Sequence, residues 1–174
     1  MILNKFLYQR EDNIRKRWMD KIVASYPDRT AVFLKQKRDQ FANPVGHILT
    51  SNVEVILQKF LEEADLKEFQ GPLNEIIKVR SIQSFSPSQA ISFIYLLKNA
   101  IRDELQDEAL NRQAFGELLE IEDRVDELGS LAVDLYMKNR EQIFELRVNE
   151  IKRTGFRLLQ KADLISSQTD SNLK

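Results

Sequence analysis

One stretch, residues 86–105, restricts the possible folds more than any other part of the chain. It opens with Ser86, Pro87 and Gln89, the start signature of a helix: serine caps, proline takes the first helical position and glutamine completes a capping box. On a helical wheel the apolar side chains of this stretch fill an arc of roughly half the circumference, wider than the stripe of a surface helix. The members of this arc are Ala90, Phe93, Ile94, Leu96, Leu97, Ala100, Ile101 and Leu105. Such a helix needs apolar neighbours on several sides, so we expect it to lie at the centre of a helical core.

Apolar residues recur at spacings of three and four along most of the chain, and no segment alternates with period two for more than a few residues. We therefore predict an all-α protein. Asn43 and Pro44 form a second clear helix start, because asparagine caps and proline suits the first helical position. Gly129 and Ser130 suit a C-cap and an N-cap, so we expect one helix to end and another to begin there. The predicted helices lie at residues 2–26, around 32–34, and at 44–61, 73–82, 86–105, 110–128 and 131–164.

Composition narrows the function classes. The 174 residues suffice for one domain with an appended element. A net charge of −1 with 30% charged residues gives no global bias toward nucleic acid or acidic lipid, and acidic neighbours dilute the basic runs at 15–17 and 35–38. The chain contains no cysteine, which excludes disulfides and thiolate metal sites. Because neither a signal peptide nor about 18 consecutive apolar residues are present, we expect a cytoplasmic protein without membrane insertion.

The residues that could carry chemistry are few. His47 is the only histidine, and its place at a predicted helix start favours a structural role over a haem or metal ligand. The sequence has no Glu-x-x-His motif of a di-iron site, no Gly-x-Ser-x-Gly motif and no glycine-rich phosphate loop. We therefore expect no catalytic residues, no metal, no cofactor and no enzymatic activity.

Three stretches together resemble a known family. They are Trp18 with Ile22 and residues 25–27, then residues 41–49, and then residues 80–90. They are similar to the RsbR/RsbRD-type N-terminal sensor domain of RsbT co-antagonist proteins, which belong to bacterial stressosomes. The residues that carry the resemblance most clearly are Trp18, Asn43, Pro44, Gly46, His47, Phe85, Ser86, Pro87 and Gln89.

This resemblance implies a globin-like helical fold without haem, which is found as a dimer and passes a signal to an attached domain. The match covers approximately residues 1–128, the sensor domain. It leaves residues 129–165 as a long C-terminal helix for dimerisation or output, and residues 166–174 as a disordered tail.

Two function classes remain open. The first is a non-catalytic bacterial sensor or interaction module of stress signalling, a homodimer that acts through helix contacts and binds a protein partner in a signalling complex. The alternative is a binder of a small apolar ligand, such as a fatty acid, in a globin-like pocket. A closed core with a large apolar dimer surface would favour the first class, and a pocket lined by apolar side chains would favour the second.

The last predicted helix is the expected contact element. Its apolar residues step by alternating fours and threes, the heptad spacing of a helix that packs on another helix. The proposed interface residues are Phe144, Val148, Ile151 and Leu158, and the same spacing continues through Gly155, Ala162 and Ile165. A helix that straps the core of its own domain is the other interpretation, and the sequence leaves both open.

Overall fold

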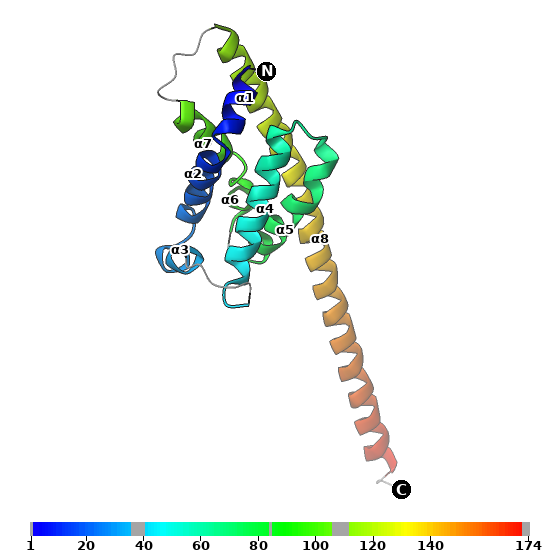
Figure 1. The fold of residues 1–174 in the computed structure, drawn as a ribbon. Coiled ribbons are helices and arrows are strands. Elements are labelled where there is room, and N and C mark those ends of the chain that lie inside the picture. The colour runs from blue at the N-terminus through cyan, green and yellow to red at the C-terminus, as the bar shows by residue number, and fades with distance from the viewer. Residues whose placement is uncertain (1, 36–40, 84, 106–111, 172–174) are drawn as a thin grey trace. The chain divides into compact units, whose positions relative to one another are not determined.

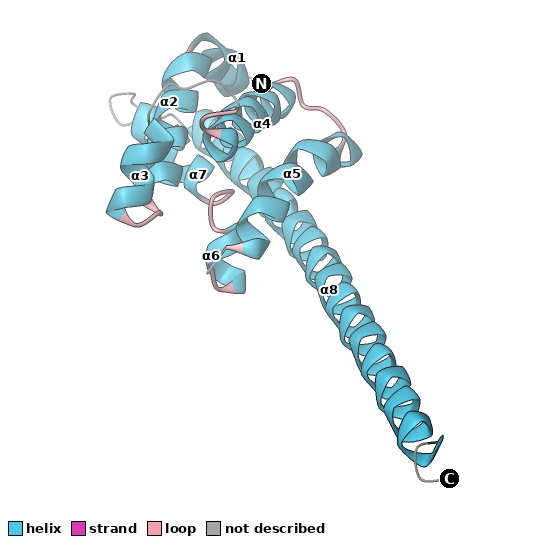
Figure 2. Cartoon of the chain, turned by 90° about the horizontal axis from the view of Figure 1, so that it is seen from below, coloured by secondary structure: helices cyan, strands magenta, loops and turns pink. Residues whose placement is uncertain are grey.

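The computed structural model describes residues 2–35, 41–83, 85–105 and 112–171, with side chains for residues 3–162 of these ranges (Figure 1). Every regular element in these ranges is helical, as Figure 2 shows, which confirms the prediction of an all-α chain with a long C-terminal helix. The elements are α1 (Ile2–Gln9), α2 (Glu11–Ala24), α3 (Asp28–Lys35), α4 (Pro44–Leu61), the 3₁₀ helix η1 (Leu66–Phe69), α5 (Gln70–Ile82), α6 (Pro87–Ile91), α7 (Leu96–Leu105) and α8 (Arg112–Ser171). The globin-like arrangement stays a prediction.

The chain divides into two units, residues 1–137 and residues 138–174. The boundary lies within α8, which is 60 residues long. The helix backbone reaches Ser171, six residues past the predicted helix end at residue 165. The division into domains 1–128, 129–165 and 166–174 stays a prediction, as does the disorder of the last of these segments.

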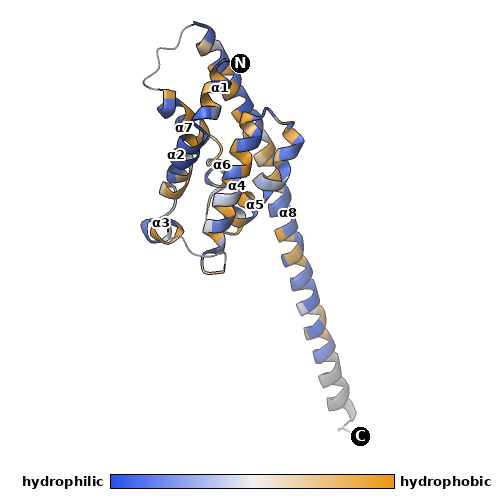
Figure 3. Ribbon diagram, viewed as in Figure 1, coloured by the Kyte–Doolittle hydropathy of each residue, from blue (hydrophilic) through white to orange (hydrophobic). Residues whose placement is uncertain are grey.

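The first unit has one apolar core, built from the inner faces of amphipathic helices. Figure 3 shows hydrophobic and hydrophilic residues alternating along these helices, as burial of one face requires. Helix α2 packs against α7 and α4, and α4 packs against α5. The side chains without exposed surface include Trp18, Leu49, Ile76, Leu97 and Val125, one each from α2, α4, α5, α7 and α8.

The central stretch is buried as predicted, but it is not one helix. Residues 92–95 form turns between α6 and α7. In a continuous helix the carbonyl of Phe93 would accept the N–H of Leu97. Here the indole Nε1–H of Trp18 donates to the Phe93 carbonyl at 2.7 Å, and the N–H of Leu97 donates to the Ile94 carbonyl at 3.0 Å instead. A side chain from another helix thus interrupts the ladder, a known cause of helix breaks.

Two other predicted helix bounds are wrong. The first helix is broken at Arg10, whose backbone (φ −111°, ψ 14°) starts α2 and whose guanidinium bonds to Glu104 on α7. The predicted break at Gly129 and Ser130 is absent, because α8 continues through both residues. The Ser130 hydroxyl donates to the carbonyl of Asp126 within the same helix at 3.1 Å, so it does not cap a new one.

A glycine occupies position 129 because of a side-chain contact and not because the helix ends there. It is buried, and a Cβ atom built at this position would overlap the hydroxyl and ring of Tyr95. The glycine therefore allows Tyr95 to approach α8 this closely, and a side chain at this point of the helix would displace the tyrosine ring.

Candidate functional site

The motif around Asn43 positions the start of α4. The Asn43 Oδ1 atom accepts the N–H of Gly46 at 2.9 Å, and its Nδ2 atom donates to the carbonyl of Phe33 at 3.2 Å. Asn43 is buried, and its side chain leaves no room for a Cβ atom at Gly46. This part of the motif therefore caps α4 and ties it to α3.

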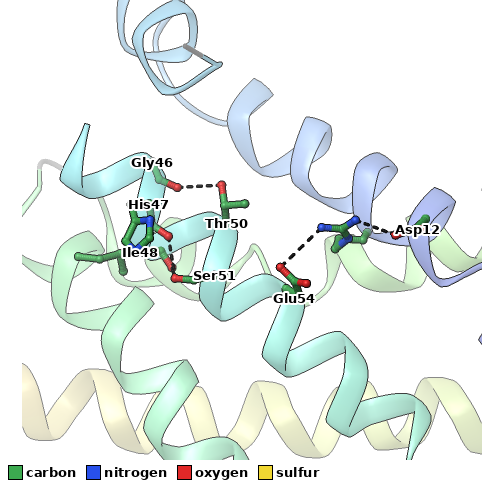
Figure 4. Close-up of polar contacts among 8 residues, drawn as sticks. Asp12, Gly46, His47, Ile48, Thr50, Ser51 and Glu54 are labelled. Atoms are coloured by element: carbon green, nitrogen blue, oxygen red, sulfur yellow. Dashed lines mark hydrogen bonds and ion pairs between the residues drawn. The ribbon is translucent and has the colours of Figure 1, made fainter. Parts of the chain in front are cut away.

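His47 lies in the first turn of α4 with its side chain exposed. Figure 4 shows its carbonyl accepting the hydroxyl of Ser51 at 2.7 Å, a contact within the helix. Among the side chains that the structure describes, no group of three or more could hold a metal ion. The absence of haem stays a prediction.

The segment before α6 has the predicted capping box. The Gln89 N–H donates to the Ser86 hydroxyl at 3.3 Å, and the Ser86 N–H donates to Gln89 Oε1 at 2.9 Å. Pro87 occupies the first turn. The box fixes where α6 begins and, with it, the direction of the Gln89 carbonyl.

The Gln89 carbonyl accepts a hydrogen bond from a buried arginine, Arg80, which the sequence analysis did not identify as a site residue. Arg80 on α5 has no exposed surface. Its Nη2 atom donates to the Gln89 carbonyl at 3.0 Å and lies 3.4 Å from the hydroxyl of Ser25. The Cζ atom lies 4.3 Å from the ring centroid of Phe85 and 5.0 Å from that of Tyr26. These four residues and Arg80 form what we call the arginine cage.

Several buried polar atoms in the cage and beside it have no hydrogen-bond partner. They are Nε and Nη1 of Arg80, the hydroxyl of Tyr26 and Oε1 of the neighbouring Gln83. Among the described side chains, no carboxylate pairs with Arg80. Burial lowers the pKa of Arg80 and raises the pKa of the Tyr26 phenol, because each charged form is poorly solvated inside the protein. The two groups lie close enough that each favours the charged form of the other, which opposes both pKa shifts.

A cavity of about 430 Å³ adjoins the cage. Its lining residues are Ser25, Tyr26, Pro27, Thr30, Gln83, Phe85 and Gln89. Four of these are the cage residues that surround Arg80. Phe85 and Gln89, two of the predicted motif residues, therefore lie at this cavity, while Trp18, Asn43 and His47 do not line it. The sequence did hold a sign of Arg80, because the spacing from Leu73 and Ile77 places it on the buried face of its helix.

The proposed interface residues lie on the second unit. Phe144, Ile151 and Leu158 expose 67%, 71% and 62% of their surface, and Val148 is half-buried. A hollow of about 520 Å³ lies over Gly155, between Ile151 and Leu158. The side chain of Ile165, the last position of the spacing, lies outside the described residues. None of the helices in the described ranges combines the length and the apolar character needed to cross a membrane.

Comparison with known proteins identifies one family. The family model described as the RsbT co-antagonist protein rsbRD N-terminal domain matches residues 12–151. A protein of Archaeoglobus fulgidus, described as an uncharacterized protein, is 27% identical over 147 residues, which cover 83% of this chain and 85% of the relative. No solved structure matches the chain. The range matched by the family model contains all nine motif residues and the whole arginine cage.

Proposed function

Because the chain belongs to the family of RsbT co-antagonist protein RsbRD N-terminal domains, we propose that it is a non-catalytic sensor module that forms a homodimer through the second unit of α8. The family implies a role in stress signalling. The observation that carries the dimer proposal is the heptad stripe of α8, defined by Phe144, Val148, Ile151, Gly155 and Leu158, whose large side chains are mostly exposed.

The shape of the stripe suits a second helix. Phe144, Ile151 and Leu158 occupy every seventh position, and Val148 and Gly155 alternate with them. In a coiled coil each such side chain enters a hole between four residues of the facing helix. Gly155 has no side chain, and the space where its Cβ would be is open, so a facing helix meets no obstruction there. A large apolar side chain of a second copy would fill this space.

The charges beside the stripe predict how salt affects the dimer. Arg147 directly precedes Val148, and Lys152 directly follows Ile151. In a parallel, in-register pair, Arg147 would lie opposite Lys152 of the partner subunit, and like charges at these flanking positions repel. Salt screens such exposed charges. Arg140 would lie opposite Glu145 of the partner subunit and attract it, so the two pairs oppose each other. Raising the salt from about 0.05 M to about 0.5 M should therefore change the affinity of the dimer little.

The alternative function, binding of a small apolar ligand, is not favoured. The cavity beside the arginine cage carries hydroxyl and amide groups of Ser25, Thr30, Gln83 and Gln89. A second hollow, between α2 and α4, is open to solvent, and its apolar surface comes largely from the aliphatic parts of charged and polar residues; its lining residues are Asp12, Asn13, Arg15, Lys16, Met19, Asp20, Thr50 and Val53. A pocket for a fatty-acid tail would be lined mainly by apolar side chains.

The test of the dimer is the molar mass in solution. We expect light scattering on a sizing column at micromolar concentration to give twice the 20.4 kDa mass of one chain. The double variant Ile151→Ser with Leu158→Ser should be a monomer. Leu146→Ser, an equally exposed apolar position outside the stripe, should remain a dimer. A monomeric wild-type chain, or a double variant that associates as tightly as the wild type, would refute the proposal.

A truncation separates the two interpretations of the last helix. Ending the chain at Asn139 removes the heptad stripe. If the helix is a contact element, the truncated chain loses self-association and keeps its thermal midpoint. If the helix instead straps the core, the truncated chain unfolds at a clearly lower temperature.

A further inference from the structure

We propose that the cavity beside the arginine cage binds the oxyanion of a small organic molecule, a carboxylate or a phosphate, with Arg80 as the group that recognises it. The cavity lies entirely within the first unit and does not include the heptad stripe. This inference therefore goes beyond the dimer proposal and does not rest on it.

The first argument is the charge of Arg80. A guanidinium stays protonated in proteins and carries five N–H donors. Nη2 uses its donors on the Gln89 carbonyl and the Ser25 hydroxyl, while the donors on Nε and Nη1 have no acceptor. A buried cation without an anionic partner is unfavourable. The rings of Tyr26 and Phe85 offset only part of this cost, because a cation–π contact is weaker than a charge-assisted hydrogen bond.

The second argument is the chemistry of the walls. An oxyanion accepts hydrogen bonds and donates none, so it complements a cluster of unused donors. The buried Tyr26 hydroxyl, which lies beside Arg80, is a further donor, and Thr30 adds a hydroxyl at the cavity. The rings of Tyr26 and Phe85 meet edge to face, with centroids 5.0 Å apart, and give the cavity an apolar wall for the body of the molecule. Oε1 of Gln83 could accept a hydroxyl or amine of the same molecule.

Access to Arg80 depends on Phe85. The Nε and Nη1 atoms have almost no exposed surface, and the Phe85 ring lies directly over the guanidinium. Phe85 is half-buried and belongs to the connection between α5 and α6. Binding at Arg80 therefore requires this ring to turn toward solvent. The oxyanion would take the place of this ring next to Nε and Nη1, and the Tyr26 ring would then form the apolar wall.

The first experiment measures thermal stabilisation of the full chain by four probes: acetate, benzoate, inorganic phosphate and phenyl phosphate. Sodium chloride at the same ionic strength is the reference. A ligand at about 100 times its Kd should raise the midpoint of a chain of this size by about 5–10 °C. We expect benzoate, phenyl phosphate or both to exceed the inorganic ions, because only they contact the apolar wall. Comparing the midpoint shift given by benzoate with the shift given by phenyl phosphate shows whether the cavity prefers a carboxylate or a phosphate.

The second experiment tests Arg80 itself. Arg80→Met should abolish the shift and leave the midpoint without probe unchanged or higher, because the buried charge is gone. Arg124→Met is the matched control: Arg124 also lies over an aromatic ring, that of Phe60, but only a cavity of about 30 Å³ adjoins it. It should keep the full shift.

A conservative variant protects the test against misfolding. If Arg80→Met does not fold, Arg80→Lys replaces it in the test. Arg80→Lys keeps the positive charge but loses the planar guanidinium group, so it should bind the probe at least about 10-fold more weakly. The Nε–H resonance of wild-type Arg80, identified by its loss in Arg80→Lys, should move when the probe is added. The shift should persist in the double variant Ile151→Ser with Leu158→Ser, whatever its oligomeric state.

Two results would overturn the inference. One is that no probe, at concentrations up to about 10 mM, raises the thermal midpoint of the wild-type chain more than sodium chloride does. Any binding of these probes would then have a Kd above about 10 mM, too weak for specific recognition. The other is a folded Arg80 variant that keeps the wild-type shift.

Discussion

Glu104 offers a sharp test of how α7 is held against the N-terminal helices. Its side chain is only 3% exposed, and its two carboxylate oxygens accept hydrogen bonds from three residues. Arg10 Nη1 and Asn13 Nδ2 donate to Oε1, each at 3.0 Å, and Arg17 Nε donates to Oε2 at 2.8 Å. Glu104→Gln keeps the size of the side chain and removes its charge.

The expected loss of stability follows from these contacts. Replacing one partner of a fully buried ion pair costs about 3–5 kcal/mol. The side chains of Arg10 and Arg17 are 43% and 49% exposed, so water can solvate both guanidinium groups after the substitution. We therefore expect a smaller loss, about 2–3 kcal/mol, equivalent to a decrease of about 5–10 °C in Tm for a chain of this size.

Urea unfolding at pH 7 measures this loss, with Glu75→Gln as the matched control. Glu75 pairs with Lys78 at 2.9 Å, but both side chains are about half exposed. Such a surface pair contributes about 0–1 kcal/mol, and the change in net charge is the same. If Glu104→Gln cost no more than Glu75→Gln, the carboxylate would not hold α7 against α2.

The pH dependence adds an independent check. Hydrogen bonds from Asn13, Arg10 and Arg17 hold the pKa of Glu104 below its ordinary value, against the opposing effect of burial. In mildly acidic solution the unfolded chain therefore binds more protons at this position than the folded chain does. The contribution of Glu104 is complete above the ordinary pKa of glutamate and is lost as the pH falls through the lowered value. The difference in stability between wild type and Glu104→Gln should shrink on acidification over this range.

Three further substitutions test the packing of the first unit. Trp18→Phe removes the donor of the buried Phe93 carbonyl, which lies 2.7 Å from the indole nitrogen, and should lower the free energy of unfolding by about 1–3 kcal/mol in urea titration. Gly129→Ala should destabilise the chain by about 1–2 kcal/mol because its Cβ overlaps Tyr95. Gly116→Ala, with open space at the same atom, should stabilise it by about 0.5–1 kcal/mol in the same assay. Equal effects of the two alanines would contradict the overlap.

Local patterns in the sequence predicted most helices correctly. The spacing of Leu49, Val53 and Leu57 determines the buried face of α4, and Asn43 and Pro44 mark its start because capping depends on neighbours only a few residues away. The heptad spacing of the second unit was also visible, since it lies within one helix.

The missed features depend on residues far apart in the chain. The break between α6 and α7 coincides with the hydrogen bond from Trp18 to the Phe93 carbonyl, and Trp18 lies 75 residues before Phe93. The sequence of residues 86–105 alone therefore does not predict the break. Gly129 was interpreted as a helix end because its contact with Tyr95, which lies in the turns between α6 and α7, does not show in the local sequence pattern.

The arginine cage was missed for the same reason. Ser25 and Tyr26 follow α2, while Arg80 lies 55 residues later on α5. Periodicity alone places Arg80 on a buried face but does not say what surrounds it there. Only the fold brings the two aromatic rings and the cavity next to its guanidinium.

The bond between Trp18 and Phe93 also provides an optical label. Trp18 is the only tryptophan of the chain, and all four tyrosines precede residue 137, so residues 138–174 contain neither type. Intrinsic fluorescence therefore reports on the contact between α2 and the turns that precede α7. Far-ultraviolet circular dichroism also records the helix of the second unit. If residues 138–174 lost their helix while the first unit stayed folded, the dichroism would fall and the tryptophan emission would not change.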